Sequence, residues 1–149
     1  SIEDLVPAAE LRQATVHEAR TFATSIAINN GDGTFQVRAL PAAAQFSPVY
    51  AALAGDFDAD GRVDLLLGGN FSGVTPVRGR YDASVGQLLR GDGRSGFTPM
   101  DMQDSGIRIS GEVRGLVSLR VRGQPAVAVA RNNDAILLLQ KQAPSSVPR

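Results

Sequence analysis

The chain has 149 residues, of which 43% are hydrophobic and 20% are charged, and it has no cysteine. This composition is typical of a single globular domain with a core, and it excludes disulfide bridges and thiolate metal sites. The 15 acidic and 15 basic residues balance, which excludes a bulk electrostatic attraction to nucleic acid. No apolar run reaches the roughly 18 residues that span a bilayer, and no signal peptide is visible, so we expect a mature chain or an excised fragment.

The first 20 residues predict a short helical or irregular segment around Pro7. From residue 21 the apolar runs are short and rich in Val, Leu, Ile and Ala, and Gly, Asn and Asp separate them, a pattern typical of β-strands joined by tight turns. The expected strands cover residues 23–29, 34–40, 49–56, 63–69, 85–90, 96–100, 113–121, 126–130 and 135–140. We expect residues 143–149 to form a disordered tail.

Three sequence markers recur at a spacing of about 60 residues, which indicates an internal repeat. The turn at residues 30–35 recurs in outline at 90–97, the strand entry at 48–49 recurs at 112–113, and residues 65–70 recur at 127–132. A four-stranded unit used more than once would produce this spacing, and chance similarity among turn-rich strands is the alternative. The sequence therefore predicts an all-β fold with about two four-stranded antiparallel units within residues 21–142.

One loop carries a dense group of carboxylates that predicts a calcium site. Its positions 1, 3, 5, 6 and 9 are Asp56, Asp58, Asp60, Gly61 and Asp64. Four acids in nine residues repel one another unless a cation lies among them, and Ca²⁺ takes six to eight oxygen ligands. The glycine permits a tight turn around the ion, and the carbonyl of position 7, Arg62, would supply a further oxygen.

Three rival interpretations of this loop are weaker. An EF-hand needs a glutamate at position 12 followed by a helix, whereas position 12 is Leu67 within an expected strand. Magnesium prefers fewer protein ligands and more water, and a solvated acidic turn is the remaining alternative. At the constant shift that aligns Asn70 with Asn132, the four aspartates fall on residues without a carboxylate: Ser118, Arg120, Arg122 and Ala126. We therefore expect one metal per chain.

Outside the acidic loop, Arg80, Tyr81 and Asp82 form the best candidate for a ligand-binding surface. They lie in a connection of residues 70–84 that is long for a hairpin, and long loops on rigid β-scaffolds often carry function. The alternative is a structural role, in which Arg80 and Asp82 form an internal ion pair and Tyr81 packs against the loop.

Two other motifs have simpler explanations. Arg90-Gly91-Asp92 spells an adhesion tripeptide, but its match to the turn at residues 30–35 already explains the glycine and the aspartate. A Ser-His-Asp triad would have to use His17, which is the only histidine and lies in the N-terminal segment. A surface histidine is the better interpretation, and we expect no enzymatic activity.

The acidic loop resembles that of integrin-type FG-GAP and VCBS repeats, which are calcium-bearing units of β-propellers. Residues 29–35 (NNGDGTF) look like the second hairpin of the same repeat. Together with the loop, residues 40–49 (LPAAAQFSPV) and 79–84 (GRYDAS) resemble the C-terminal propeller region of bacterial ASPIC/UnbV-type repeat proteins. The resemblance covers roughly residues 14–140.

This resemblance implies a calcium-stabilised β-propeller module for binding or assembly in an extracytoplasmic compartment of a bacterium. Its calcium would be structural, held by the carboxylates of the acidic loop and the carbonyl of Arg62. The alternatives are a fragment of a propeller-based enzyme that acts on polysaccharide, or a lectin-like sugar-binding domain. We expect a protein or glycan ligand of unknown identity, no nucleic-acid partner and no membrane span.

The chain departs from the family in its length, because propellers usually need six or seven blades and two repeats at most are present. It also begins with what look like the outer strands of a blade, residues 23–40, and ends with inner strands, residues 113–140. Outer strands of one protomer could therefore complete the inner strands of the next, which would give a six-bladed ring from three chains. The alternative is that the chain is part of a longer propeller.

Overall fold

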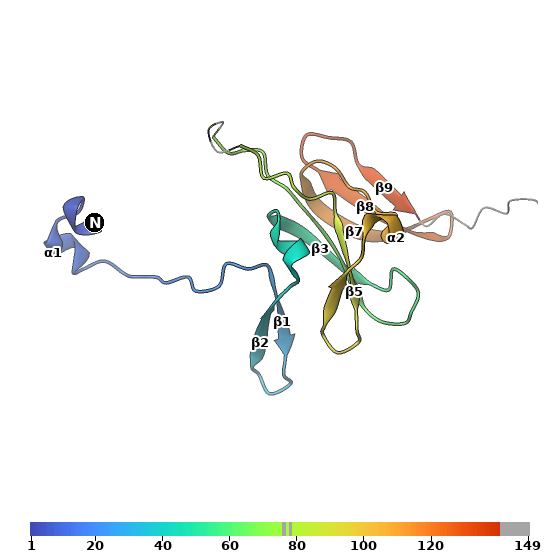
Figure 1. Cartoon of the computed structure of the whole chain (residues 1–149), viewed down its shortest axis with the longest axis horizontal. Helices are drawn as coiled ribbons and strands as arrows, with labels where there is room; N and C mark the ends of the chain where they lie inside the picture. The colour runs from blue at the N-terminus through green and yellow to red at the C-terminus, as the bar shows by residue number, and fades with distance from the viewer. Residues whose placement is uncertain (76, 78, 141–149) are drawn as a thin grey trace, which may run out of the picture.

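The computed structural model describes residues 1–75, 77 and 79–140, and most of its regular structure is antiparallel β-sheet (Figure 1). The strands are β1 (Ser25–Asn29), β2 (Phe35–Ala39), β3 (Val49–Gly55), β4 (Asp64–Gly69), β5 (Gln87–Gly91), β6 (Phe97–Pro99), β7 (Val113–Val121), β8 (Gln124–Arg131) and β9 (Leu137–Gln140). The helical turns are η1 (Ile2–Asp4), α1 (Ala8–Leu11), η2 (Ala42–Gln45) and α2 (Met102–Ser105).

The sequence predicts the strands well and the short helical turns less completely. Each of the nine expected strands is present, and the alternation of apolar and polar residues explains why. In the N-terminal segment, Pro7 precedes α1, which lies apart from the sheets at the end of an extended stretch (Figure 1). Neither η2 nor α2 was expected. The predicted tail, residues 143–149, lies outside the described residues.

The described strands form three antiparallel sheets in which consecutive strands are neighbours. The first sheet is the hairpin β1–β2, the middle sheet has the order β3-β4-β5-β6, and the third sheet has the order β7-β8-β9. The all-β expectation is therefore confirmed, together with one complete four-stranded antiparallel unit.

The middle sheet is packed on both faces, because alternate residues of a strand point to opposite sides. On one face, Leu66 and Leu88 join a core cluster with residues of the third sheet, including Val113 and Val129. On the other face, Leu67 and Leu89 pack against Leu40 and Ala44 of the β2–β3 connection, with Ile26 of β1 beside them. Neighbouring leucines of β4 therefore belong to two different core clusters.

The third sheet repeats the backbone register of the middle sheet. A break in register lies between Val49 and Ala51 of β3, and the same break lies at the equivalent place in β7, between Val113 and Gly115. At the far end of each hairpin, the residue after the second strand donates its amide to the residue before the first strand, from Asn70 to Pro48 and from Asn132 to Glu112. The hairpins β3–β4 and β7–β8 therefore repeat one hydrogen-bond pattern. The predicted second four-stranded unit has three strands among the described residues.

The register corrects one detail of the sequence comparison. In the middle sheet Gly55 pairs with Asp64, and the equivalent pair in the third sheet is Leu119 with Ala126, so the shift between the sheets is slightly larger for the first strand than for the second. The counterpart of Asp56 is therefore Arg120 and not Ser118. The third-sheet hairpin continues for two more pairs and closes at Arg122 and Gly123, both with positive φ, and residues 120–126 contain no carboxylate.

Candidate metal centre

The acidic loop, residues 56–63, joins β3 to β4 and begins directly after the last pair of that hairpin, Gly55 with Asp64. Two of its residues have left-handed backbones, Ala59 with φ 69° and Gly61 with φ 82°. A glycine adopts this conformation without steric cost, whereas an alanine does so only with strain. The loop therefore curls back on itself and brings Asp56 and Asp58 close to Asp64.

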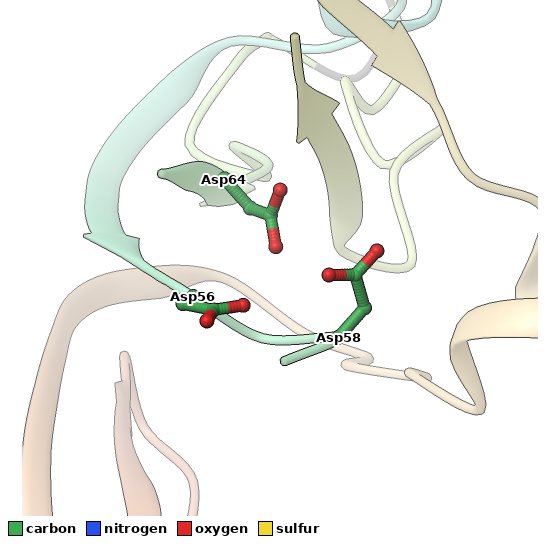
Figure 2. Close-up of side chains that lie close together, drawn as sticks. All are labelled: Asp56, Asp58 and Asp64. Carbon is green, nitrogen blue, oxygen red and sulfur yellow. The ribbon is translucent and has the colours of Figure 1, made fainter. Parts of the chain in front are cut away.

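Three aspartates meet at that point (Figure 2). Asp56, Asp58 and Asp64 each offer one carboxylate oxygen, and these oxygens all lie within 4.8 Å of one another. Two ligands of one calcium ion, each about 2.4 Å from it, can be at most about 4.8 Å apart. The three carboxylates could therefore hold a metal ion, and their oxygen-only chemistry suits a hard divalent cation.

Asp64 is the most constrained of the three, because its side chain is fully buried. Its Oδ2 accepts the Phe57 amide at 2.9 Å, and its Oδ1 accepts the Gly91 amide at 2.9 Å. A Cβ added to Gly91 would overlap the carbonyl oxygen of Val63, so only glycine fits where β5 approaches the loop. Asp64 therefore connects the loop, β4 and β5, in addition to its expected role as a ligand.

Asp56 organises the loop through its own hydrogen bonds. Its Oδ1 accepts the amides of Ala59 at 2.7 Å and Asp60 at 3.1 Å, and its Oδ2 accepts the amide of Gly61 at 3.0 Å. A side-chain carboxylate that accepts nearby amides in this way stabilises a turn. The same carboxylate is thus fixed in direction before any ion binds.

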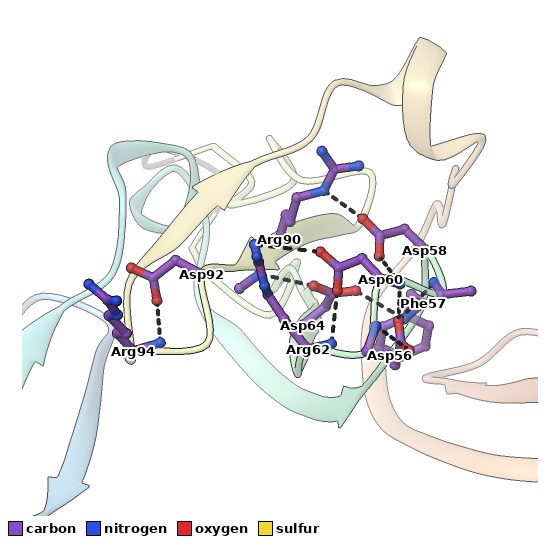
Figure 3. A network of polar contacts seen from close by, with 12 residues as sticks. Asp56, Phe57, Asp58, Asp60, Arg62, Asp64, Arg90, Asp92 and Arg94 are labelled. Atoms are coloured by element: carbon purple, nitrogen blue, oxygen red, sulfur yellow. Dashed lines mark hydrogen bonds and ion pairs between the residues drawn. The ribbon is translucent and has the colours of Figure 1, made fainter.

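Arg90 contacts the acidic triad, which the sequence analysis did not anticipate. Its Nε donates to Oδ2 of Asp58 at 2.5 Å, so a protein cation lies against the triad (Figure 3). The Asp58 side chain is 15% exposed and that of Arg90 is 51% exposed, so water screens the pair only in part. Arg90 follows the buried Leu89 on β5, and nothing in the sequence placed that strand beside the loop.

The rest of the Arg90-Gly91-Asp92 tripeptide also has structural contacts. The Gly91 amide binds Asp64, and Oδ1 of Asp92 accepts the amides of Arg94 at 2.6 Å and Gly96 at 2.8 Å. These two amides hold the pKa of the Asp92 carboxyl below its usual value. Each member of the tripeptide is therefore used inside the fold, which supports the turn interpretation.

The other two expected ligands lie outside the triad. Oδ1 of Asp60 accepts the Arg62 amide at 2.8 Å, and Oδ2 lies 4.0 Å from Nη1 of Arg62 (Figure 3). Asp60 is absent from the group of convergent carboxylates among the described residues. Ligation by the Asp60 side chain and by the Arg62 carbonyl therefore stays a prediction.

The candidate binding segment of residues 80–82 lies on the exposed part of its loop. Tyr81 forms an isolated antiparallel bridge with Phe71, and its side chain keeps 45% of its surface exposed. Arg80 and Asp82 are both exposed, and no salt bridge joins them. The structural alternative based on that ion pair is therefore not supported, and the binding role stays a prediction.

The buried side-chain amide of Asn70 holds the two ends of this loop together. The sequence analysis did not anticipate this role. Asn70 is 3% exposed, and its Oδ1 accepts the Ser47 hydroxyl at 2.7 Å and the Ser84 amide at 3.1 Å. Its Nδ2 donates to the carbonyls of Ser84 at 2.7 Å and Gly111 at 3.0 Å. One side chain therefore joins the two ends of the loop to the start of the third sheet.

The chain matches no protein-family model, no curated protein and no solved structure. The likeness to FG-GAP and VCBS repeats therefore stays a prediction from the sequence motifs. Among the helices of the described residues, none is both long enough and apolar enough to cross a membrane.

Proposed function

We propose that this chain is a calcium-stabilised β-repeat module for binding or assembly, with propeller-type blades and an extracytoplasmic location. The observation that carries the proposal is the convergence of three carboxylates within 4.8 Å where β3 turns into β4. The repeated register of the middle and third sheets supports the view that each sheet is one unit of a larger β-array.

The position of the triad favours a structural role for calcium. Asp56 and Asp58 belong to the loop, whereas Asp64 begins β4 and also binds the amide of Gly91 in β5. An ion among them would join both strands of the hairpin and, through Asp64, the third strand. An ion that binds only the folded loop stabilises the native state by about 2.7 kcal/mol at 100 times its dissociation constant. Millimolar calcium outside the cytoplasm would fill a weak site of this kind.

Calcium is preferred over magnesium because of the size and charge of the site. Three carboxylates supply several oxygens to one point, whereas Mg²⁺ keeps most of its water and usually takes one or two carboxylates. The proposal therefore expects stabilisation by calcium at concentrations where magnesium has little effect.

Thermal melting in calcium, in magnesium and in chelator tests the proposal. We expect calcium to raise the melting temperature by several degrees, since about 1 kcal/mol corresponds to about 2–4 °C in a domain of this size. The variant Asp56→Asn should lose the shift, because the amide gives up one ligand charge. Asp101→Asn is the matched control, because the Asp101 side chain makes no capping hydrogen bond at α2 and lies outside the loop. Equal melting of the unmodified chain in calcium and in chelator would rule out the calcium proposal.

A further inference from the structure

One apolar face of the third sheet is exposed in the part of the chain that the structure describes. In the middle sheet Leu66 pairs with Leu88, and both are buried against the third sheet, with 0% and 4% of their surfaces exposed. The equivalent pair in the third sheet is Ala128 with Leu138, at the same place in the register. Leu138 is 45% exposed, and Val117, which pairs with Ala128 from the other side, is 61% exposed. The surface that packs inside the chain in one sheet is therefore open in the next.

The face of the middle sheet that points away from the third sheet is also partly exposed. The face of the middle sheet that points toward β1–β2 is covered over β4 and β5, where Leu67 and Leu89 are buried. Over the edge strand β3, Ala52 and Ala54 on that face are exposed. Figure 1 shows β1–β2 and the third sheet at different ends of the array of sheets.

We propose that a second copy of this chain docks on the third sheet, so that the open face carrying Val117 and Ala128 packs against β3 of that copy. The contact continues an interface that already exists inside the chain, where the face of the middle sheet with Leu53 and Leu66 packs against the third sheet. Within the described residues, each copy leaves one such face open and offers one such partner face, so the contact is heterologous. We expect it to close into a ring. It rests on the proposed role as a β-repeat module, but it does not require calcium.

Charge supports the same arrangement. The β3–β4 connection is the acidic loop. The equivalent end of the β7–β8 hairpin carries two exposed arginines, Arg120 in the last pairs of β7 and Arg122 in the turn. Equivalent turns lie at the same end of stacked sheets, so the basic turn of one copy would face the acidic loop of the next. Acidic and basic turns then alternate around the ring, which favours this order of contacts over contacts between like sheets.

The hairpin β1–β2 matches the outer half of a complete sheet. In that hairpin Ala27 pairs with Val37, and in the middle sheet Leu89 of β5 pairs with Pro99 of β6. The same spacing along the chain separates Ala27 from Leu89 and Val37 from Pro99, so the two hairpins have equal register. β1 is therefore equivalent to the third strand of a complete sheet, and β2 is equivalent to the fourth.

This equivalence identifies which strand must move. β9 pairs with β8 through Val127 with Leu139, where the middle sheet pairs Leu65 with Leu89. β9 therefore occupies the place that β1 of a second copy would take. The docked copy replaces β9 at the edge of β8 and supplies β2 as the fourth strand, which completes a four-stranded sheet.

Light scattering of the unmodified chain across the micromolar range provides the first test. A closed oligomer is expected, with three copies giving six sheets, within the four to eight that propeller rings use. Val117→Asp should make the chain monomeric, because it places a charge in the proposed contact at a position that is exposed in the single chain. Val16→Asp is the control for the same chemical change, since Val16 is 86% exposed in the N-terminal segment. A monomeric mass at every concentration would overturn the proposal.

A disulfide across β8 and β9 tests the strand exchange directly, because the chain has no cysteine of its own. In the double variant Ala128→Cys with Leu138→Cys, the paired positions are within reach of a disulfide, and oxidation would hold β9 on β8. We expect a monomer when this variant is oxidised and an oligomer after reduction. An oligomer of unchanged mass in the oxidised form would contradict the exchange of β1 for β9. Melting in calcium reports on the metal independently, so the two proposals can fail separately.

Discussion

Asp58 is the point at which the candidate metal centre and the surrounding protein compete. One of its oxygens belongs to the convergent triad, and Oδ2 accepts a hydrogen bond from Arg90. Partial burial of the aspartate strengthens this ion pair relative to one in open solvent. The guanidinium therefore neutralises part of the charge that would attract a metal.

Removing that guanidinium should strengthen calcium binding. For Arg90→Gln we expect about a fivefold rise in calcium affinity, which is about 1 kcal/mol and the upper range for a partly exposed ion pair. Calorimetric titration with calcium measures this change directly. Arg94→Gln is the charge-matched control, because the contact of Arg94 with Asp92 is through its backbone amide. A weaker affinity in Arg90→Gln would instead mean that Arg90 orients Asp58 for the ion.

The acidic triad could be predicted from sequence because its members lie within one short stretch of the chain. Asp56, Asp58 and Asp64 are at most eight positions apart, and a turn with glycine at the sixth position must bring them together. The contacts of Arg90 and Asn70 depend on pairing between distant segments, such as Asn70 with Gly111. Local spacing does not contain that information, so both residues emerged only from the fold.

At the scale of elements, Glu112 connects the hairpin ends of two sheets. Its Oε1 accepts the Ser72 amide at 2.6 Å, and its Oε2 accepts Nδ2 of Asn132 at 2.9 Å and Nη2 of Arg114 at 2.7 Å. The guanidinium of Arg114 also lies 4.2 Å from the centre of the Tyr50 ring, a cation–π contact with β3. Hydrogen bonding by the Ser72 side chain, then by Asn132, lowers the pKa of Glu112 to about 2.

This lowered pKa predicts a pH-dependent stability. Because the folded pKa lies below the ordinary value of 4.5, the charged carboxylate stabilises the fold above pH 4.5, and this contribution is lost as the pH falls toward about 2. Glu112→Gln should therefore melt at a lower temperature than the unmodified chain at neutral pH, and the gap should shrink between those two values. Glu10→Gln makes the same chemical change in α1, away from the sheets. A gap that stays constant from neutral pH down to the folded pKa would show that shape, and not charge, explains the effect.

The strands were predictable because each is either an alternation of apolar and polar residues or a continuous apolar run, with turn residues on both sides. For β7, both the first and the last residue were predicted correctly. The helical turns η2 and α2 span four residues each, too few for a helical period to be visible. The third strand of the third sheet was located correctly in sequence. Its equivalence to β1 was not visible, because that follows from cross-strand pairs and not from residue types.

At the scale of the whole molecule, equivalent positions of the two sheets differ in burial, and the effect of this difference on stability can be measured. Leu88 and Leu138 occupy the same place in their sheets, but Leu88 is 4% exposed and Leu138 is 45% exposed. Truncating a fully buried leucine to alanine costs about 2–5 kcal/mol, because it loses apolar contact and leaves a cavity. We therefore expect Leu88→Ala to lower the free energy of unfolding by that amount, and Leu138→Ala to lower it by about 1 kcal/mol or less.

Urea unfolding of both variants, at a protein concentration where light scattering reports a monomer, measures the difference. The two substitutions remove the same atoms from strands with the same cross-strand partner position, so each serves as the control for the other. Equal losses of stability would mean that the third sheet is as well covered as the middle sheet in the isolated chain. The open face would then offer no apolar surface to a second copy, because burying what is already buried releases no further free energy.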